Sequence, residues 1–244
     1  MKKILAILLS LLLVSCFALT GCDGKEEASA AKTIREWQSQ YTAGSFGIRN
    51  LNDPFVELTL STGDTIRLEL YPNVAPISVE NFMKYVEDGF YEGVIFHRII
   101  KNFMIQTGGF EEKEVTLESG EKETRLSQKT PTYPAIKGEF SANGVRNDLS
   151  HTRGVLSMAR TGVKNSATSQ FFICSEITEA QTASLNGKYA ALGCVIDEES
   201  MEVVSKLEKV ETTSKPLYYA DNGQPSSDVP VETIKITKAT LYKA

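Results

Sequence analysis

The sequence is poor in the residues from which metal and redox sites are built. It contains two histidines, His97 and His151, and four cysteines with no Cys-x-x-Cys pair. A zinc or redox site needs several such ligands at suitable spacing, so we expect no metal. Basic residues do not exceed acidic ones either, because 26 Lys and Arg stand against 31 Asp and Glu, for a net charge of -5. The scattered basic residues therefore indicate no nucleic-acid partner.

Long apolar runs are absent except at the N-terminus. Lys2 and Lys3 precede an almost wholly apolar segment, residues 4–19, which leads into Leu-Thr-Gly-Cys at 19–22. This order is typical of an export signal, and its apolar run is shorter than the ~20 residues that span a bilayer. The four-residue sequence resembles a bacterial lipobox, which implies cleavage before Cys22 and lipid attachment to its thiol. An ordinary signal peptide with an incidental cysteine is the alternative.

These features predict how the chain is organised. We expect a lipoprotein signal peptide at 1–21, a lipidated tether at 22–50 with weak helical character, and one domain at 51–244. The protein is then expected on the extracytoplasmic face of the cell membrane, anchored through the lipid on Cys22. Cys174 and Cys194 lie in apolar contexts of the domain, where free cysteine packs as a small hydrophobe, and the sequence leaves open whether they pair.

Alternating apolar residues predict a β-hairpin at the start of the domain. Apolar and polar residues alternate from Val56 to Leu60 and again from Ile66 to Leu70, the period typical of half-buried strands. The turn-forming sequence Ser-Thr-Gly-Asp at 61–64 separates the two runs. Further short segments resemble strands: 154–158, 170–174, 190–196 and 232–237.

Two segments have helical periodicity. After Pro76, apolar residues recur at i, i+3, i+4 and i+7 between Val79 and Val86, and Gly89 is placed to end this helix. A second helix is predicted after the acidic residues 197–199. Many antiparallel strands with two amphipathic helices indicate a mainly β barrel or sandwich covered by the helices.

Two segments break this pattern. The stretch 111–128 is highly charged, and 212–228 mixes proline, glycine and serine with two tyrosines. We expect both to be surface insertions in the domain.

Several blocks closely resemble the cyclophilin signature. They are Phe-His-Arg-Ile-Ile-Lys-Asn-Phe-Met-Ile-Gln-Thr-Gly-Gly at 96–109, Gly-Val-Leu-Ser-Met-Ala at 154–159, Ser-Gln-Phe-Phe-Ile at 169–173 and Leu-Asn-Gly-Lys-Tyr at 185–189. The resemblance implies a closed eight-stranded antiparallel β-barrel capped by two α-helices. It also implies peptidyl-prolyl cis-trans isomerase activity on proline-containing polypeptides, without a cofactor, in a monomer.

The resemblance assigns roles to individual residues. Rotation about the bond before proline breaks no bond but has a barrier of about 18–20 kcal/mol. Arg98 is the residue implied to donate to the prolyl nitrogen as the amide twists, and Gln106 to hold the substrate backbone and orient Arg98. The implied proline slot is formed by Phe103, Met104, Phe172 and Leu185. Ala159, Arg160 and Gln170 are implied to line the groove, and Tyr189 to close its edge.

Each assignment has an ordinary alternative. Arginine is mostly a surface residue, and single apolar residues usually belong to the core. In a strand, Phe171 and Phe172 point to opposite faces, so one is expected in the core and one in the groove. His97 is expected to be structural, and His151 to lie in a loop or at the start of a strand.

The sequence also departs from well-studied eukaryotic cyclophilins. Ser184 stands where those members have tryptophan, and Arg160 and Tyr189 where they commonly have asparagine and histidine. We therefore expect weak inhibition by cyclosporin, with isomerisation retained. The function expected is to assist the folding of exported proteins outside the cytoplasmic membrane. The alternatives are a module that binds proline-containing segments with little turnover and a structural envelope lipoprotein.

Overall fold

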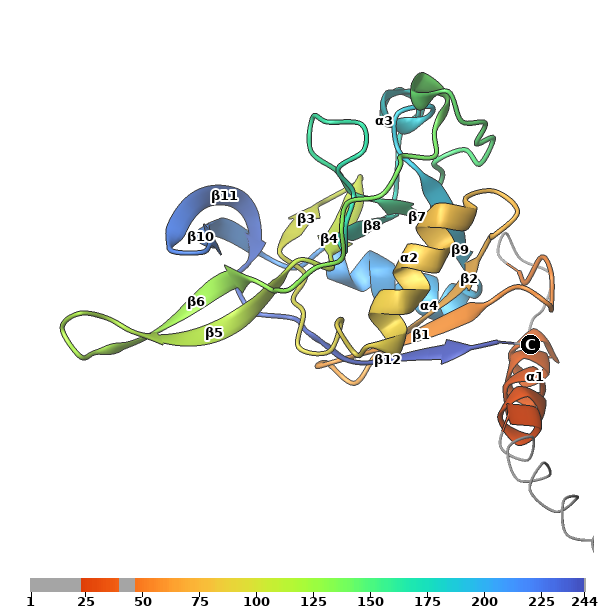
Figure 1. Ribbon diagram of the computed structural model, residues 1–244, viewed down its shortest axis with the longest axis horizontal. Helices are drawn as coiled ribbons and strands as arrows, with labels where there is room; N and C mark the ends of the chain where they lie inside the picture. Colours follow the sequence, from red (N-terminus) through yellow and green to blue (C-terminus); the bar gives the residue numbers. More distant parts are fainter. Residues whose placement is uncertain (1–22, 40–46, 244) are drawn as a thin grey trace, which may run out of the picture.

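A computed structural model describes residues 23–39 and 47–243 of the chain. Its main feature is an eight-stranded sheet with strand order β12-β1-β2-β9-β7-β8-β4-β3, in which every pairing is antiparallel (Figure 1). The strands are β1 Phe55–Leu60, β2 Thr65–Leu70, β3 Arg98–Ile100, β4 Met104–Thr107, β7 Val155–Met158, β8 Phe171–Cys174, β9 Ala191–Val195 and β12 Ile236–Tyr242. The expected signal peptide at 1–21 and Cys22 lie outside the described residues.

The predicted hairpin is formed by β1 and β2. Val56, Leu58 and Leu60 are buried in the main core, as alternation predicts. Leu58 pairs with Ile66, and Gly63 takes a φ of 84° in the intervening turn, a conformation that costs glycine little.

The sheet curves until its ends meet, but β3 and β12 do not pair along their length. Instead, the Gly93 amide donates to the Ile236 carbonyl at 2.8 Å, and the Phe96 amide donates to the Ile234 carbonyl at 3.0 Å. The expected closed barrel is therefore joined at this seam, between the chain that precedes β3 and the chain that leads into β12 up to its first residue, Ile236. The last strand also begins at Ile236 rather than near Glu232, because residues 234–236 form the seam.

Both predicted helices cover the barrel. α2 (Pro76–Glu87) packs against β12 and β9, and α4 (Glu198–Leu207) packs against β2. Pro76 opens α2, and Gly89 follows its end with a φ of 65°. The short α3 (Glu179–Leu185) and the 3₁₀ turn η1 (Ser141–Asn143) were not predicted.

The N-terminal helix is longer than the sequence predicts and contacts the domain. α1 spans Asp23–Ser39 and lies beside the end of β12 (Figure 1). Ile34 is 1% exposed and packs with Phe55 and Ile196, while the Trp37 ring meets the Tyr242 ring edge-on at 5.0 Å. This part of the expected tether is therefore a docked helix.

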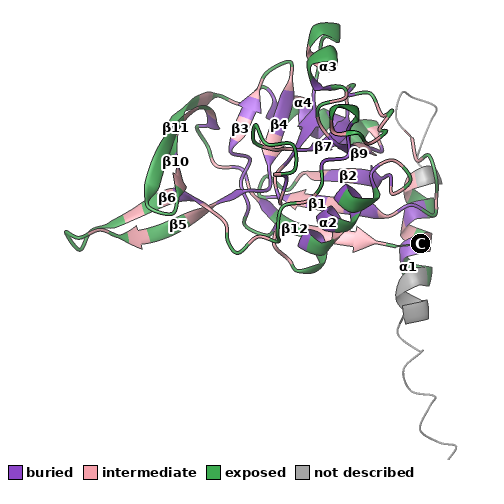
Figure 2. Cartoon of the chain, turned by 45° about the horizontal axis from the view of Figure 1, so that its top comes forward, coloured by how far each residue is buried: buried purple, intermediate pink, exposed green. Residues whose placement is uncertain are grey.

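The two expected surface insertions pair with each other. They form β5 (Phe110–Thr116), β6 (Lys122–Gln128), β10 (Thr212–Tyr219) and β11 (Asn222–Pro230), a second sheet with the order β11-β10-β6-β5. We call it the second sheet, and it projects from the barrel in Figures 1 and 2. β10 runs parallel to β6 where Leu217 pairs with Leu126. The strands of the second sheet and Ile95, which precedes β3, form a small separate core of Ile95, Phe110, Leu126, Leu217 and Val229.

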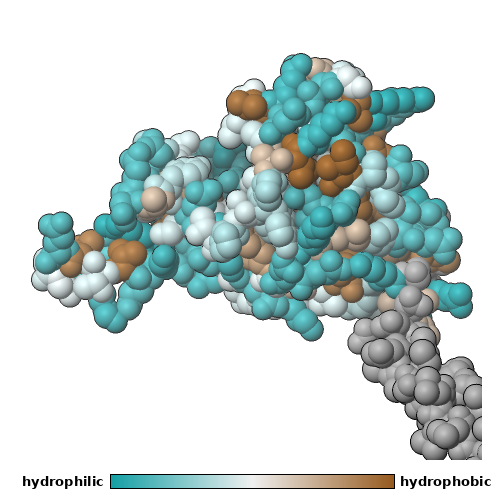
Figure 3. Space-filling view, viewed as in Figure 1, coloured by the Kyte–Doolittle hydropathy of each residue, from teal (hydrophilic) through white to brown (hydrophobic). Residues whose placement is uncertain are grey.

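Most buried side chains lie inside the barrel, where the strands are predominantly buried and the outer side of α2 is exposed (Figure 2). The face drawn in Figure 3 is mainly hydrophilic, with small scattered apolar patches. Cys174 on β8 and Cys194 on β9 are both free thiols on strands that β7 separates. Among the helices of residues 23–39 and 47–243, none combines the length and apolarity needed to cross a membrane.

Candidate active site

A cleft of about 260 Å³ opens on the barrel surface beside β3, β4 and β8. All the predicted site residues except Gln170 and Cys22 line it: Arg98, Phe103, Met104, Gln106, Ala159, Arg160, Phe172, Leu185 and Tyr189. Cys22 lies outside the described residues. The fold thus brings together side chains that are up to 91 positions apart in sequence, from Arg98 to Tyr189.

The floor of the cleft is apolar. Met104, Phe172 and Leu185 form a buried cluster, and Phe103 and Tyr189 pack against it. On the same strand, Phe171 belongs to the main core while Phe172 belongs to this cluster, which confirms the predicted alternation. An apolar cleft with a few polar groups at its rim is the usual form of a small-molecule or peptide-side-chain site.

Arg98 and Gln106 meet at the polar edge of the cleft. They lie directly opposite each other in the β3–β4 ladder. The Arg98 Nη1 group donates to Gln106 Oε1 at 3.4 Å, and Gln106 Nε2 donates to Gln170 Oε1 at 3.0 Å. Gln170 is not among the residues that line the cleft, and its contact with Gln106 holds the amide of Gln106 that faces Arg98.

A second partner of Arg98 was not predicted. The carboxylate of Asp228, on β11 of the second sheet, lies 3.6 Å from Arg98 Nε, and the two side chains are 34% and 41% exposed. Asp228 belongs to a segment expected to be a surface insertion, and it comes close to Arg98 only through pairing between distant strands. No local sequence signal could have shown this contact.

Arg160 covers the far rim of the cleft. Its Nε donates to the Lys188 carbonyl at 2.9 Å, and its guanidinium lies over the rings of Tyr189 and Phe140 at 4.6 and 5.0 Å from their centroids. The positive charge is therefore held against aromatic faces. Tyr189 in turn meets Phe172 edge-on at 5.9 Å between centroids.

The two histidines are both buried, and one of them, His151, contacts the cleft residue Phe172. His97 is buried with its ring 4.8 Å from Phe110, and burial lowers its pKa to about 4. His151 precedes β7, as expected for a loop position, but its ring is buried and stacks on Phe172 at 6.1 Å. Its ring nitrogens contact Asn186 Oδ1 at 3.0 Å and Ser157 Oγ at 2.9 Å. Burial lowers the pKa of His151 as well, which favours the neutral ring.

Glu208 also supports the cleft and was missed by the sequence analysis. It is 3% exposed, and its carboxylate accepts a hydrogen bond of 3.0 Å from the Asn102 amide. Asn102 has a φ of 56° in the turn that carries Phe103. Glu208 thereby stabilises a strained turn that places one wall of the cleft.

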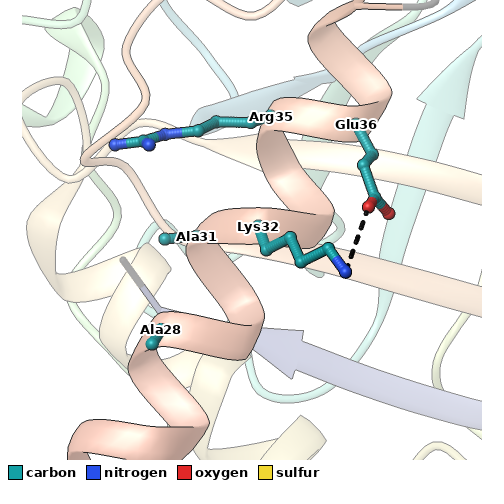
Figure 4. A pocket seen from close by; sticks show the side chains of 5 residues that line it. All are labelled: Ala28, Ala31, Lys32, Arg35 and Glu36. Carbon is teal, nitrogen blue, oxygen red and sulfur yellow. Dashed lines mark ion pairs between the residues drawn. The ribbon is translucent and has the colours of Figure 1, made fainter.

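Another hollow lies along α1 and has a different character. Its lining comes from one face of that helix: Ala28, Ala31, Lys32, Arg35 and Glu36. Lys32 and Glu36 form an ion pair of 3.7 Å, and Arg35 extends away from them (Figure 4). This exposed helix surface does not gather groups from different elements, unlike the cleft beside β3.

Known proteins are similar to this chain in both sequence and fold. The family described as cyclophilin type peptidyl-prolyl cis-trans isomerase/CLD matches residues 55–241. A peptidyl-prolyl cis-trans isomerase of Acinetobacter baylyi is 40% identical over 78% of this chain and 90% of its own length. Peptidyl-prolyl cis-trans isomerase B of Escherichia coli is 36% identical over 72% of this chain and 95% of its own length.

A solved structure agrees with these relatives. It is a cyclophilin type isomerase of Cryptosporidium parvum, determined in the presence of the dipeptide Ala-Pro, with a TM-score of 0.55 and 25% identity. The match covers 78% of this chain and 99% of that one. The chain therefore belongs to the family of cyclophilin-type peptidyl-prolyl cis-trans isomerases, enzymes that catalyse rotation about the peptide bond before proline.

Proposed function

We propose that Arg98 is the catalytic residue of this isomerase. A twisted X-Pro amide loses its resonance and leaves a lone pair on the prolyl nitrogen. A guanidinium that donates to this lone pair binds the twisted amide better than either planar form, which lowers the barrier. The observation that carries the proposal is the position of Arg98 at the edge of the apolar cleft, with Nη1 in contact with Gln106.

The substrate proline fits the apolar part of the cleft. Its ring would lie against Phe103, Met104, Phe172 and Leu185, which pack together in one apolar cluster. Gln106, Ala159, Arg160 and Tyr189 would hold the backbone on either side, supported by Gln170 behind Gln106. No covalent bond is broken, so the enzyme accelerates the rotation by orienting the substrate and by stabilising charge on the prolyl nitrogen. Each tenfold acceleration requires that the barrier be lowered by about 1.4 kcal/mol.

We further propose that the enzyme acts on exported proteins at the membrane surface. The support lies in residues 1–22, with their basic start, apolar run and Leu-Thr-Gly-Cys ending. A lipid on Cys22 would anchor the enzyme as a monomer on the extracytoplasmic face. There it would shorten the slow proline steps of newly exported chains, which otherwise take tens of seconds.

Arg98→Ala tests the catalytic assignment. Full-length protein in detergent is assayed for isomerisation of an X-Pro peptide, and peptide binding is measured separately. We expect turnover to fall about 100-fold, the usual effect of losing a transition-state donor, while binding changes only a few-fold. Arg146→Ala is the matched control, because that side chain is 88% exposed and pairs only locally with Asp148 in the structure. Unchanged turnover in Arg98→Ala would refute the assignment, and absence of turnover in the wild type would favour a binding module.

Cys22→Ala tests the anchor. Cells that express the wild type should retain the protein in the membrane fraction, and cells that express the variant should release it. Retention of both proteins in the membrane would rule out the thiol as the anchor.

A further inference from the structure

The pairing of β11 with β10 delivers Asp228 to the cleft. Thr213 pairs with Val229 and Lys215 pairs with Ser226, so Ser227 and Asp228 together face the single residue Ser214. Two residues opposite one form a β-bulge, a device that re-aims a side chain at the edge of a sheet. The two residues after Asp228 are buried, with Val229 in the small core of the second sheet. Asp228 therefore has a well-anchored backbone at a bulge beside β3.

Arg98 is held at two points. Asp228 lies 3.6 Å from Nε, and Gln106 Oε1 accepts from Nη1 at 3.4 Å. Neither of these two contacts involves Nη2, so the guanidinium keeps donors for a ligand. Because the guanidinium is planar, contacts at Nε and Nη1 together fix both its position and its rotation. A single contact would leave the group free to turn about that contact.

We propose that Asp228 is a positioning residue for Arg98, through which the second sheet acts on catalysis. This inference rests on the proposed catalytic role of Arg98. An arginine side chain has several rotatable bonds, and freezing them before the substrate arrives lowers the cost of reaching the transition state. Asp228 does not line the cleft, so its removal should affect the rate of isomerisation and leave the binding of the proline ring nearly unchanged. The segment 212–228 thereby contributes to catalysis through Asp228.

The test compares Asp228→Ala and Asp228→Asn with Asp221→Asn in full-length protein in detergent. Asp221 lies exposed in the turn between β10 and β11, so its substitution removes the same charge from the same sheet. We expect kcat/KM for an X-Pro peptide to fall about three- to fivefold in Asp228→Ala, the scale of one half-exposed ion pair. Asp228→Asn keeps the size and polarity of the side chain but loses the charge that forms the ion pair, so its kcat/KM should also fall, by no more than in Asp228→Ala. Asp221→Asn should match the wild type. The peptide Kd should stay within twofold in all three.

A spectroscopic signal tests the contact independently of activity. The Arg98 Nε–Hε resonance in a ¹⁵N spectrum, identified by its loss in Arg98→Lys, should move and exchange faster with water in Asp228→Ala. It should be unchanged in Asp221→Asn. Thermal unfolding of each variant shows whether the second sheet is intact, and Asp228→Asn keeps the test usable where Asp228→Ala unfolds.

The outcomes separate this inference from the catalytic proposal. In an Arg98→Ala background, Asp228→Ala should change the residual rate by less than twofold, because Asp228 acts through Arg98. An unchanged Nε–Hε resonance, or equal kcat/KM in Asp228→Ala and wild type, would overturn the positioning role while leaving Arg98 catalytic. If Arg98→Ala itself keeps full turnover, the catalytic proposal fails first.

Discussion

At the scale of single residues, neighbours in the sequence have opposite environments. Arg98 is 41% exposed at the cleft, whereas His97 is 2% exposed beneath the second sheet. The strand geometry explains the difference, because consecutive side chains point to opposite faces. The burial of His97 has a consequence for stability that can be measured.

We expect His97 to make the protein less stable in acid. Its folded-state pKa is about 4, below the ordinary value of 6.5, so the unfolded state binds a proton first as the pH falls. The free energy of unfolding should therefore decrease from pH 6.5 downwards, by about 2 kcal/mol at pH 5 for this group alone. Urea unfolding at pH 7, 6 and 5 measures the effect.

His97→Asn provides the comparison. This variant lacks the titrating ring, so its stability should depend less steeply on pH over the same range, with a remaining slope from His151, whose pKa burial also lowers. Only the slopes are compared, because the substitution also changes packing against Phe110. Identical slopes in the two proteins would show that His97 is not held neutral.

At the scale of elements, α2 depends on a residue far away in the sequence. Its N-cap residue, Ala75, offers no side-chain hydrogen bond. Instead, the buried carboxylate of Glu139 accepts hydrogen bonds from the Ile77 amide at 3.1 Å and from the amide and hydroxyl of Ser78, both at 2.7 Å. A carboxylate at a helix N-terminus also interacts favourably with the helix dipole.

We expect Glu139→Ala to lower the free energy of unfolding by about 2–3 kcal/mol, because it leaves buried donors unpaired. Glu139→Gln should lower the free energy of unfolding by less, since its amide oxygen can still accept one of these hydrogen bonds. Glu80→Ala is the control on the same helix, where an exposed pair with Lys84 should contribute less than about 0.5 kcal/mol. Urea unfolding measures all three, and equal stability of Glu139→Ala and Glu80→Ala would contradict the capping role.

At the scale of the whole molecule, contacts between segments distant in sequence join α1, the barrel and the second sheet. α1 packs on the barrel through Ile34 and Trp37, and the second sheet reaches the cleft through Asp228. The guanidinium of Arg67 also lies 5.7 Å from the Trp37 ring centroid. The barrel is thus the common support for the N-terminal helix and for the second sheet.

We expect Ile34→Ala to undock α1 without loss of isomerase activity. Truncating a buried isoleucine typically costs 2–5 kcal/mol, and Ala30 is the one other buried residue among residues 28–37 of α1, whose burial the structure describes. Amide hydrogen exchange in α1 should accelerate on the order of tenfold or more, while exchange in the barrel and kcat/KM stay the same. Lys32→Ala, whose side chain is 78% exposed, should leave exchange nearly unchanged. Equal exchange in α1 of both variants would mean that Ile34 does not hold the helix.

The sequence by itself determined the parts of this protein that depend on local pattern. Period-two alternation located β1 and β2, helical periodicity located α2 and α4, and the resemblance of residues 96–109 and 169–173 identified the family and the side chains that line one cleft. These predictions succeed because strand and helix periods, and short motifs, are properties of neighbouring residues.

Only the tertiary structure decided the rest. The pairing of β6 with β10, the contact between Asp228 and Arg98, the cap that Glu139 provides to α2 and the docking of α1 all join residues distant in sequence. Segments 111–128 and 212–228 are polar enough to resemble loops, and they become strands because each supplies the other with a partner and a share of a small core. Such long-range pairing leaves no periodic trace in either segment alone, since its stabilising energy appears only when both are brought together.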